Sequence, residues 1–171
     1  MLIAQNLCAQ WKQTNGPFGG SVSSIIADSN ILLAGGRFAG VYVSTDDAAT
    51  WKIKDTALFR QGVNCFAKSG SRLIAGADKV FFSKDRGQSW STIDSGFTNA
   101  AVTCLAVRSD AVFAGTADGV YMLREGMNRW VRIDSNFNQE NIVAVGLRDS
   151  CIFVSTIYNG LYFSRDDGKT W

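Results

Sequence analysis

All five tryptophans of the chain fall at one phase of a single repeat. They stand 40, 39, 40 and 41 residues apart, at Trp11, Trp51, Trp90, Trp130 and Trp171. A constant spacing of this length indicates an array of similar supersecondary units, each of which buries its apolar surface against its neighbours. Recurring residues are therefore expected to hold the array together, and specific function is expected to come from residues that do not recur.

Each repeat contains four short runs of β-branched and aromatic residues, separated by Gly, Asp, Asn and Ser. In the third repeat these runs span residues 102–108, 111–116, 119–123 and 130–133. Four strands at a period of ~40–50 residues are typical of a β-propeller blade. Helical repeats would need a period of about 3.6 residues, which no segment shows. The sequence therefore predicts an all-β fold, a β-propeller of four-stranded antiparallel blades in which each tryptophan begins an outer strand.

The blade boundaries follow from the tryptophan phase. We expect blades at about residues 15–54, 55–93, 94–133 and 134–171, the last completed by residues 11–14. Residues 1–10 lie outside the repeat. The segment Leu7-Cys8-Ala9 resembles the small-residue end of a secretory leader. We interpret residues 1–10 as the remnant of such a leader or as a short edge strand.

Composition excludes several function classes. The 171 residues carry a net charge of +2 with no basic stripe, which argues against a nucleic-acid partner. No apolar run reaches the ~18–20 residues that a membrane span requires. The chain has no histidine, which removes Ser-His-Asp and Cys-His catalysis and His-ligated metal sites. We therefore expect no cofactor, no metal and no catalytic residue.

The four cysteines do not indicate a disulfide framework. Cys65 and Cys104 occupy equivalent repeat positions, matched by Ser24 and Ala144 in the other copies. A series of Ser, Cys, Cys and Ala indicates a position where only a small side chain fits, here called the small slot, and free cysteine packs as a small hydrophobe. CxxC spacing is absent. We expect Cys65 and Cys104 to be buried free thiols.

Three of the segments that precede a tryptophan share a further motif. Residues 164–171 read Ser-Arg-Asp-Asp-Gly-Lys-Thr-Trp, residues 83–90 have Ser in place of Thr, and residues 44–51 have Ala48 in place of Gly. They match the pattern Ser-x-Asp-x-Gly-x-Thr-Trp. Over essentially residues 11–171 the chain resembles Asp-box (BNR) repeat β-propellers, a group with sialidase-, sortilin- and photosystem-assembly-factor-like members. The resemblance implies that each box forms the turn between the third and fourth strands of a blade.

The box residues are expected to be structural. A Ser hydroxyl and an Asp carboxylate can bond to the backbone of a turn, Gly permits a positive φ, and Trp packs between sheets. Ala48 in the Gly position and Glu125 in the Asp position predict looser turns in the first and third copies. The residues with this structural role are Ser44, Asp46, Trp51, Ser83, Asp85, Gly87, Trp90, Trp130, Ser164, Asp166, Gly168 and Trp171.

Function is expected on the opposite ends of the blades. There the turns between second and third strands meet the loops that lead into each blade, and several residues do not recur. Phe18, Phe97 and Phe137 do recur, seven residues after their tryptophans, and are expected to plug the core. The predicted binding residues are Arg37, Phe38, Arg60, Lys79, Asp118, Glu140 and Tyr158. The leading hypothesis is a non-catalytic, secreted or periplasmic scaffold that binds a protein or a carbohydrate.

Two other functions stay open. Glycosidases need two carboxylates across a cleft, and Asp118 and Glu140 are the tempting pair for a fragment of a sialidase-like or glucan-hydrolysing propeller. The Phe-Arg-Ile-Pro signature of sialidases is absent, since residues 59–62 read Phe-Arg-Gln-Gly. The third hypothesis is a purely structural segment of a larger secreted or sensor protein.

Closure of the ring is the last expectation. The chain starts with an unmatched outer strand and ends directly after a tryptophan, so Trp11–Thr14 is predicted to pair beside Gly160–Ser164. The small slot described above would permit a ring of four blades. The alternative is an open array that exposes Ile142, Val143 and Val145 and associates with itself or with further blades.

Overall fold

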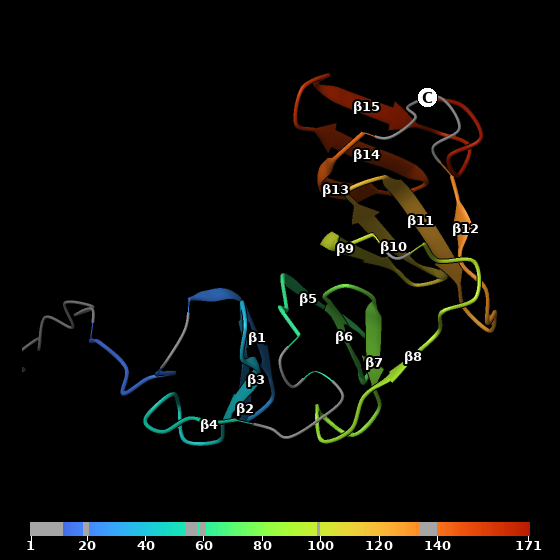
Figure 1. The fold of residues 1–171 in the computed structure, drawn as a ribbon. Coiled ribbons are helices and arrows are strands. Elements are labelled where there is room, and N and C mark those ends of the chain that lie inside the picture. Colours follow the sequence, from blue (N-terminus) through green and yellow to red (C-terminus); the bar gives the residue numbers. More distant parts are fainter. Residues whose placement is uncertain (1–11, 19–20, 54–57, 59–60, 99, 134–139) are drawn as a thin grey trace, which may run out of the picture.

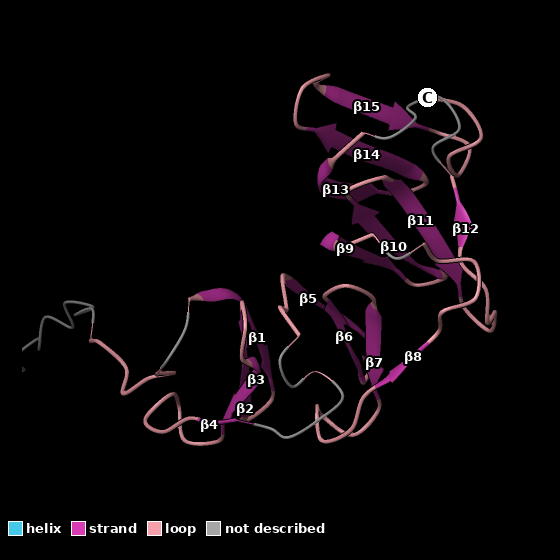
Figure 2. Cartoon of the chain, viewed as in Figure 1, coloured by secondary structure: helices cyan, strands magenta, loops and turns pink. Residues whose placement is uncertain are grey.

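The computed structural model describes residues 12–18, 21–53, 58, 61–98, 100–133 and 140–171. Every regular element within these ranges is a β-strand (Figure 2). The described residues contain no helix that could cross a membrane. The prediction of an all-β fold is confirmed.

The strands form four antiparallel sheets, numbered here as blades 1 to 4, with neighbours in chain order. Blade 1 contains β1 (Val22–Asp28), β2 (Ile31–Gly36), β3 (Gly40–Ser44) and β4 (Lys52–Ile53). Blade 2 contains β5 (Cys65–Ser69), β6 (Arg72–Gly76), β7 (Val80–Ser83) and β8 (Ser91–Thr92). Blade 3 contains β9 (Val102–Arg108), β10 (Ala111–Thr116), β11 (Gly119–Arg124) and β12 (Val131–Arg132). Blade 4 contains β13 (Ile142–Arg148), β14 (Cys151–Thr156) and β15 (Leu161–Ser164).

The blades follow one another along an open arc (Figure 1). Strands β5, β9 and β13 lie on its concave side, and the outer strands β8 and β12 lie on its convex side. Each described outer strand begins one residue after its tryptophan, one position later than predicted. Blades 1 and 4 lie at opposite ends of the arc.

The apolar core lies between successive blades, because alternate residues of each strand face opposite neighbours. Leu33 and Val41 of blade 1 pack against Leu73, Phe81 and Trp90 of blade 2. The same arrangement recurs between blades 2 and 3 and between blades 3 and 4, where Trp130 and Trp171 contribute. Each of these three tryptophans thus packs toward the preceding blade.

Two further contacts recur at every interface between blades. A glycine of the second strand admits a branched side chain from the next blade: a Cβ at Gly115 would lie 2.6 Å from Cγ2 of Ile142. Gly35 and Gly76 have the same relation to Val63 and Val102. In addition, a polar side chain donates a hydrogen bond to the carbonyl of that branched residue, from Ser23 to Val63, from Asn64 to Val102 (2.8 Å) and from Thr103 to Ile142 (2.6 Å).

The predicted pairing that would close the ring is wrong for the residues described. Residues 12–14 form no strand, and the fourth sheet has three strands. Residues 12–15 instead lie beside residues 47–49 of blade 1. In Figure 1 this segment and β15 lie at opposite ends of the arc, so the curvature of the four blades keeps them apart. Trp11 and residues 1–10 lie outside the described residues.

The prediction for the recurring phenylalanines holds only in part. Phe97 is partly buried against Tyr121 and Trp130, and Leu58, at the equivalent position in the second copy, is fully buried. Phe18 is 74% exposed, which contradicts the prediction. The difference is position, because Phe97 lies between two blades whereas Phe18 precedes blade 1. Phe137 lies outside the described residues.

Cys65, Cys104 and Cys151 are free thiols, as predicted for the first two. Cys65 and Cys104 are half-buried rather than fully buried as expected. Burial raises the pKa of Cys65 to about 12. Cys65 and Cys104 therefore act as small packing residues beside Gly76 and Gly115 of the second strands.

Candidate binding face

The turns between the second and third strands and the loops that enter each blade lie at the same end of the sheets. Backbone hydrogen bonds join them within three blades: Arg37 N to Ser21 O (3.0 Å), Ala117 N to Ala101 O (3.3 Å) and Ile157 N to Asn141 O (3.1 Å). At the same end, Val102 N of blade 3 donates to Ala77 O in the β6–β7 turn of blade 2 (2.7 Å). We call this end the turn face. It comprises residues 37–39, 77–79, 117–118 and 157–159 with the described parts of the entry loops.

Exposed aromatic side chains lie on the turn face at both ends of the arc. Phe38, in the β2–β3 turn, is 78% exposed, and Tyr158, in the β14–β15 turn, is 87% exposed. The Arg37 guanidinium lies 5.9 Å from the centre of the Phe38 ring. Ile157 is also exposed beside Tyr158. An aromatic ring, an arginine and an aliphatic side chain are therefore available to a ligand.

The charged residues predicted for this face are engaged in local contacts. Lys79 pairs with Asp94 at 3.0 Å, and this contact lowers the pKa of Asp94. Asp118 accepts hydrogen bonds from Thr98 (2.9 Å) and Thr116 (2.7 Å). These groups thus stabilise the turns and the entry loops.

Glu140 accepts a hydrogen bond from Asn159 within blade 4, whereas Asp118 is held within blade 3. Among the described hydrogen bonds none joins Asp118 to Glu140 or brings them onto a common group. The two carboxylates are therefore held by different blades, and each accepts hydrogen bonds from its own neighbours. Arg60 lies outside the described residues.

The predicted residues thus separate into two sets. Arg37, Phe38 and Tyr158 are exposed. Lys79 forms an ion pair with a neighbouring loop, and Asp118 and Glu140 accept hydrogen bonds from residues of the turns. Sequence reasoning missed the exposure of Phe18 and Ile157 on this face. Phe18 precedes the first complete repeat, and that position was the signal that could have identified it.

The opposite end of the sheets carries the turns that join β3 to β4, β7 to β8, and β15 to Trp171. Ser44 donates to Asp46 (2.8 Å) and accepts from Ala48 N (3.0 Å), and Asp46 accepts from Thr50 N (2.8 Å). Residues 83–89 and 164–170 repeat this pattern with matching distances. We call these three segments the Ser–Asp turns.

Hydrogen bonds fix the charge of the three aspartates. Donation from the side chain and backbone of Thr50, Ser89 and Thr170 lowers the pKa of Asp46, Asp85 and Asp166 to about 2. Such carboxylates are ionised acceptors at neutral pH and supply no proton to a substrate. Their geometry is that of structural residues.

One expectation for these turns is wrong and one is confirmed. The first turn is not loosened by Ala48, which takes a φ of 66° where Gly87 and Gly168 take 81° and 84°, and its hydrogen bonds are all formed. The hydrogen bonds of the Ser and Asp side chains therefore hold an alanine in the left-handed region. The third turn does lack them: Glu125 pairs with Arg72 at 2.8 Å instead.

The tryptophans complete the structural set. Trp130 Nε1 donates to Ile93 O at 2.9 Å, and Trp171 Nε1 donates to Ile133 O at 2.8 Å. Each bond links a blade to the segment that leaves the outer strand of the preceding blade. Trp51 and Trp90 bury the same nitrogen without a partner in the part of the chain described.

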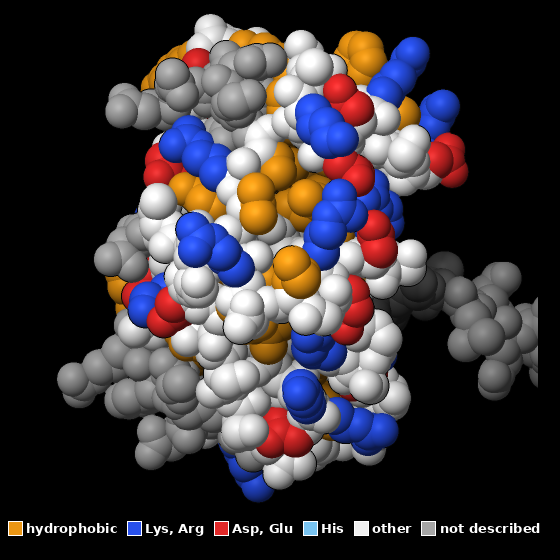
Figure 3. Space-filling model, turned by 90° about the vertical axis from the view of Figure 1, so that its right-hand side faces the viewer, with side chains coloured by type: hydrophobic (Ala, Val, Ile, Leu, Met, Phe, Trp, Pro, Cys, Tyr) orange, Lys and Arg blue, Asp and Glu red, His pale blue; other side chains and the backbone are white. Residues whose placement is uncertain are grey.

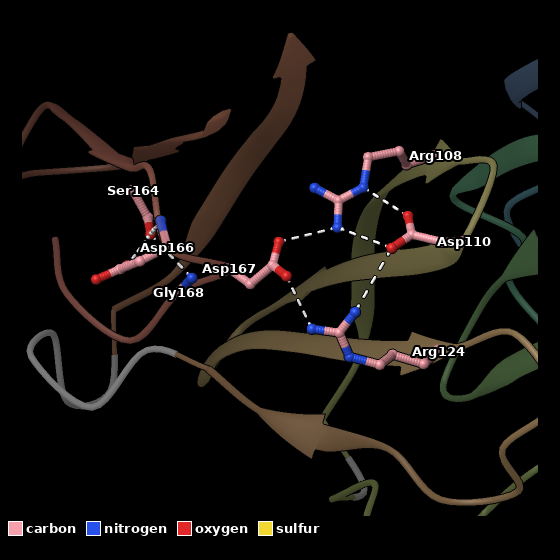
Figure 4. A network of polar contacts seen from close by, with 7 residues as sticks. All are labelled: Arg108, Asp110, Arg124, Ser164, Asp166, Asp167 and Gly168. Carbon is pink, nitrogen blue, oxygen red and sulfur yellow. Dashed lines mark hydrogen bonds and ion pairs between the residues drawn. The ribbon is translucent and has the colours of Figure 1, made fainter. Parts of the chain in front are cut away.

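The interface between blades 3 and 4 adds an ionic network (Figure 4). Arg108 and Arg124 of blade 3 both contact Asp167, at 2.9 and 2.8 Å, and Arg108 also contacts Asp110 at 2.6 Å. The two guanidinium groups lower the pKa of Asp167. Asp167 precedes the glycine of the last Ser–Asp turn, so the network ties that turn to the preceding blade.

The convex side of the arc differs from the turn face. Figure 3 shows basic and acidic side chains interspersed there with small apolar areas. Val131 and Met127 are both exposed and line one small pocket. The charges form no continuous basic surface in this view.

Comparisons with known proteins identify the fold. No protein-family model matches the chain, and no curated protein matches it. Solved structures do. The computationally designed Ika4 protein superposes with a TM-score of 0.71 at 14% identity, over 90% of this chain and 96% of Ika4. The fold is a β-propeller.

Natural proteins share this fold over part of their length. The extracellular domain of the hybrid two-component system BT4673 from B. thetaiotaomicron has a TM-score of 0.75 at 15% identity, covering 91% of this chain and 22% of that one. YCF48 bound to D1 peptide has a TM-score of 0.64 at 14% identity, covering 86% and 50%. A GH74 xyloglucanase from Xanthomonas campestris has a TM-score of 0.69 at 18% identity, covering 90% and 29%. At these identities the likeness is one of fold alone.

Proposed function

We propose that this chain is a non-catalytic, extracytoplasmic Asp-box β-propeller module that binds a protein segment or a glycan on its turn face. The observation that carries the proposal is the division of that face. Phe38, Tyr158 and Arg37 are exposed, while the carboxylates that a hydrolase would need are held by their own turns. Aromatic residues and arginine are enriched at the centres of binding interfaces.

Two comparisons support the choice of ligand class and location. YCF48 is seen with a bound peptide, and the BT4673 region is an extracellular domain. The three Ser–Asp turns support assignment to the Asp-box group, since each carries the hydrogen bonds that the motif implies.

The test is direct binding to defined probes. The chain would be titrated against a peptide array and a glycan array that includes xyloglucan oligosaccharides. For any probe that the parent binds, the variant Arg37→Ala/Phe38→Ala/Tyr158→Ala is expected to lose at least about tenfold in affinity. Such a loss corresponds to about 1.4 kcal/mol of binding free energy. A matched control, Lys84→Ala/Arg86→Ala, changes two exposed residues at the opposite end and is expected to bind as the parent does.

The competing hydrolase hypothesis rests on the GH74 structures with this fold. It predicts release of reducing ends from xyloglucan, with loss of that activity in Asp118→Asn or Glu140→Gln. Such a result would replace the binding proposal. Equal loss of binding in the triple variant and in the control would contradict it as well.

A further inference from the structure

The outward face of blade 4 exposes side chains that the other blades bury. Leu161 is 69% exposed, whereas its equivalents Val41, Val80 and Val120 are 0–2% exposed. Phe163 is 50% exposed, and its equivalents Phe82 and Met122 are 5% and 6% exposed. These positions pack against the next blade everywhere else in the chain. Blade 4 therefore presents a blade-to-blade surface that nothing covers within the described residues.

The outward face of blade 1 is the complementary half. Ile25 is 61% exposed, although its equivalents Phe66, Leu105 and Val145 pack against a preceding blade. Phe18 is exposed where Phe97 is enclosed. The two outward faces thus have the side-chain classes of the two halves of an internal interface.

Charge makes the match specific. Arg108 and Arg124 hold Asp167 across the interface between blades 3 and 4 (Figure 4). One repeat later, their equivalents on the outward face of blade 4 are Arg148, whose side chain is 82% exposed, and Arg165, also exposed. The equivalent of Asp167 is Asp47, exposed on the first Ser–Asp turn.

The strands match in the same way. Residues 131–133, in and directly after β12, lie beside residues 167–169 of the next blade. Residues 12–14 occupy the same place relative to residues 47–49 of blade 1, ahead of that blade and without a sheet of their own. Blade 4 has three strands in the order β13-β14-β15, so β15 is the last strand of its sheet among the described residues.

We propose that two copies of this chain associate about a two-fold axis, with blade 4 of each packed on blade 1 of the other. Residues 12–14 of each copy supply the outer strand beside β15 of its partner. Within one copy the two faces lie at opposite ends of the arc (Figure 1), so they cannot meet each other. Two-fold pairing covers both ends of both copies at once, and the second contact forms as an intramolecular step once the first exists.

The new interface differs from the internal ones at two positions. Ser155 stands where Gly35, Gly76 and Gly115 admit a branched side chain, and Val143 stands where Ser23, Asn64 and Thr103 donate a hydrogen bond. Contact between the copies is therefore weaker than contact between adjacent blades. The variant Val143→Thr/Ser155→Gly restores both features and is expected to lower the dimer dissociation constant at least about tenfold.

Sedimentation velocity over a concentration series of the full 171-residue chain tests the proposal. The parent is expected to reach twice the monomer mass, and Asp47→Arg is expected to raise the dissociation constant at least about tenfold. Arg is tolerated at this position, because Arg86 occupies it in blade 2 with a φ of 58° against 54° for Asp47. Arg148→Asp/Arg165→Asp is expected to have the same effect, and combining all three changes is expected to restore pairing. Circular dichroism verifies that each variant is folded.

Several outcomes would overturn the proposal. These are a monomer at every concentration, a dimer indifferent to Asp47→Arg and to the arginine pair, and open oligomers that grow without a limit at two copies. Failure of the triple charge reversal to restore pairing would show that these residues do not face each other.

Discussion

The two ends of each blade follow opposite rules. At one end, three turns repeat the same hydrogen bonds, and their serine side chains are buried. At the other end the side chains differ from turn to turn, and aromatic side chains extend into solvent at Phe38 and Tyr158. The contrast shows where this chain is constrained by folding and where its surface is available for recognition. It also makes the two ends separable by mutation.

The largest expected effect is on the repeated end. Ser83 is buried, donates to Asp85 at 2.8 Å and accepts from Gly87 N at 2.7 Å. Ser83→Ala leaves that amide without a partner, which typically costs about 1–3 kcal/mol in the free energy of unfolding. Urea denaturation measures the loss. The neighbouring exposed Lys84→Ala is the control, and an equal loss there would show that the turn is not specifically stabilising.

Acid probes the same turns without removing a side chain. The pKa values of Asp46, Asp85 and Asp166 are about 2 in the folded chain, below the ordinary value of 3.8. Since the depressed pKa favours folding only while the groups are ionised, this stabilisation is complete above about pH 4 and falls as the pH drops toward 2. The stability difference between the parent and Asp85→Asn is therefore expected to shrink over that range. A difference that stays constant with pH would mean that the charge of Asp85 contributes nothing.

The tryptophan spacing and the alternation of apolar residues were enough to predict the blades, because both patterns come from packing that repeats. The prediction of a structural role for the Ser–Asp residues came instead from the motif that recurs before three of the tryptophans. Sequence could not predict how far the arc curves, and so placed residues 11–14 beside β15. Curvature depends on how closely successive blades approach, as at Gly115 and Ile142, and local patterns do not report that distance.

The same limit applies to the candidate site. Exposed and engaged residues look alike in sequence when neither recurs, as Tyr158 and Asp118 show. Asp118 is engaged because Thr98 and Thr116 reach it from an entry loop and a strand end, and only the folded chain brings these together. Recurrence therefore indicates which residues hold the turns, but it does not separate exposed from engaged residues among those that do not recur.

A smaller and opposite effect is expected where the repeated end departs from its own rule. Ala48 holds a φ of 66° in a position that glycine occupies in the other two Ser–Asp turns. A left-handed conformation costs an L-residue about 1–2 kcal/mol, and glycine avoids this cost. Glycine also has more conformational freedom in the unfolded chain, which offsets about 0.4–1 kcal/mol of the gain from replacing alanine. Ala48→Gly is expected to raise the free energy of unfolding by about 0.5–1 kcal/mol. Thermal and urea denaturation measure it, and Ala49→Gly in the same turn is the control.

The smallest expected effect on stability lies on the turn face. Phe38 and Tyr158 are largely exposed, and the Arg37 guanidinium lies 5.9 Å from the centre of the Phe38 ring. Substitutions of surface residues away from buried contacts usually change the free energy of unfolding by no more than about 0.5 kcal/mol. The variant Arg37→Ala/Phe38→Ala/Tyr158→Ala is therefore expected to be as stable as the parent. Asp118→Ala on the same face is the informative counterpart, because it removes the hydrogen bonds that Asp118 accepts from Thr98 and Thr116 and is expected to destabilise the chain. If the triple variant lost as much stability as Asp118→Ala, its residues would be part of the scaffold, and the distinction between the two ends of the blades would fail.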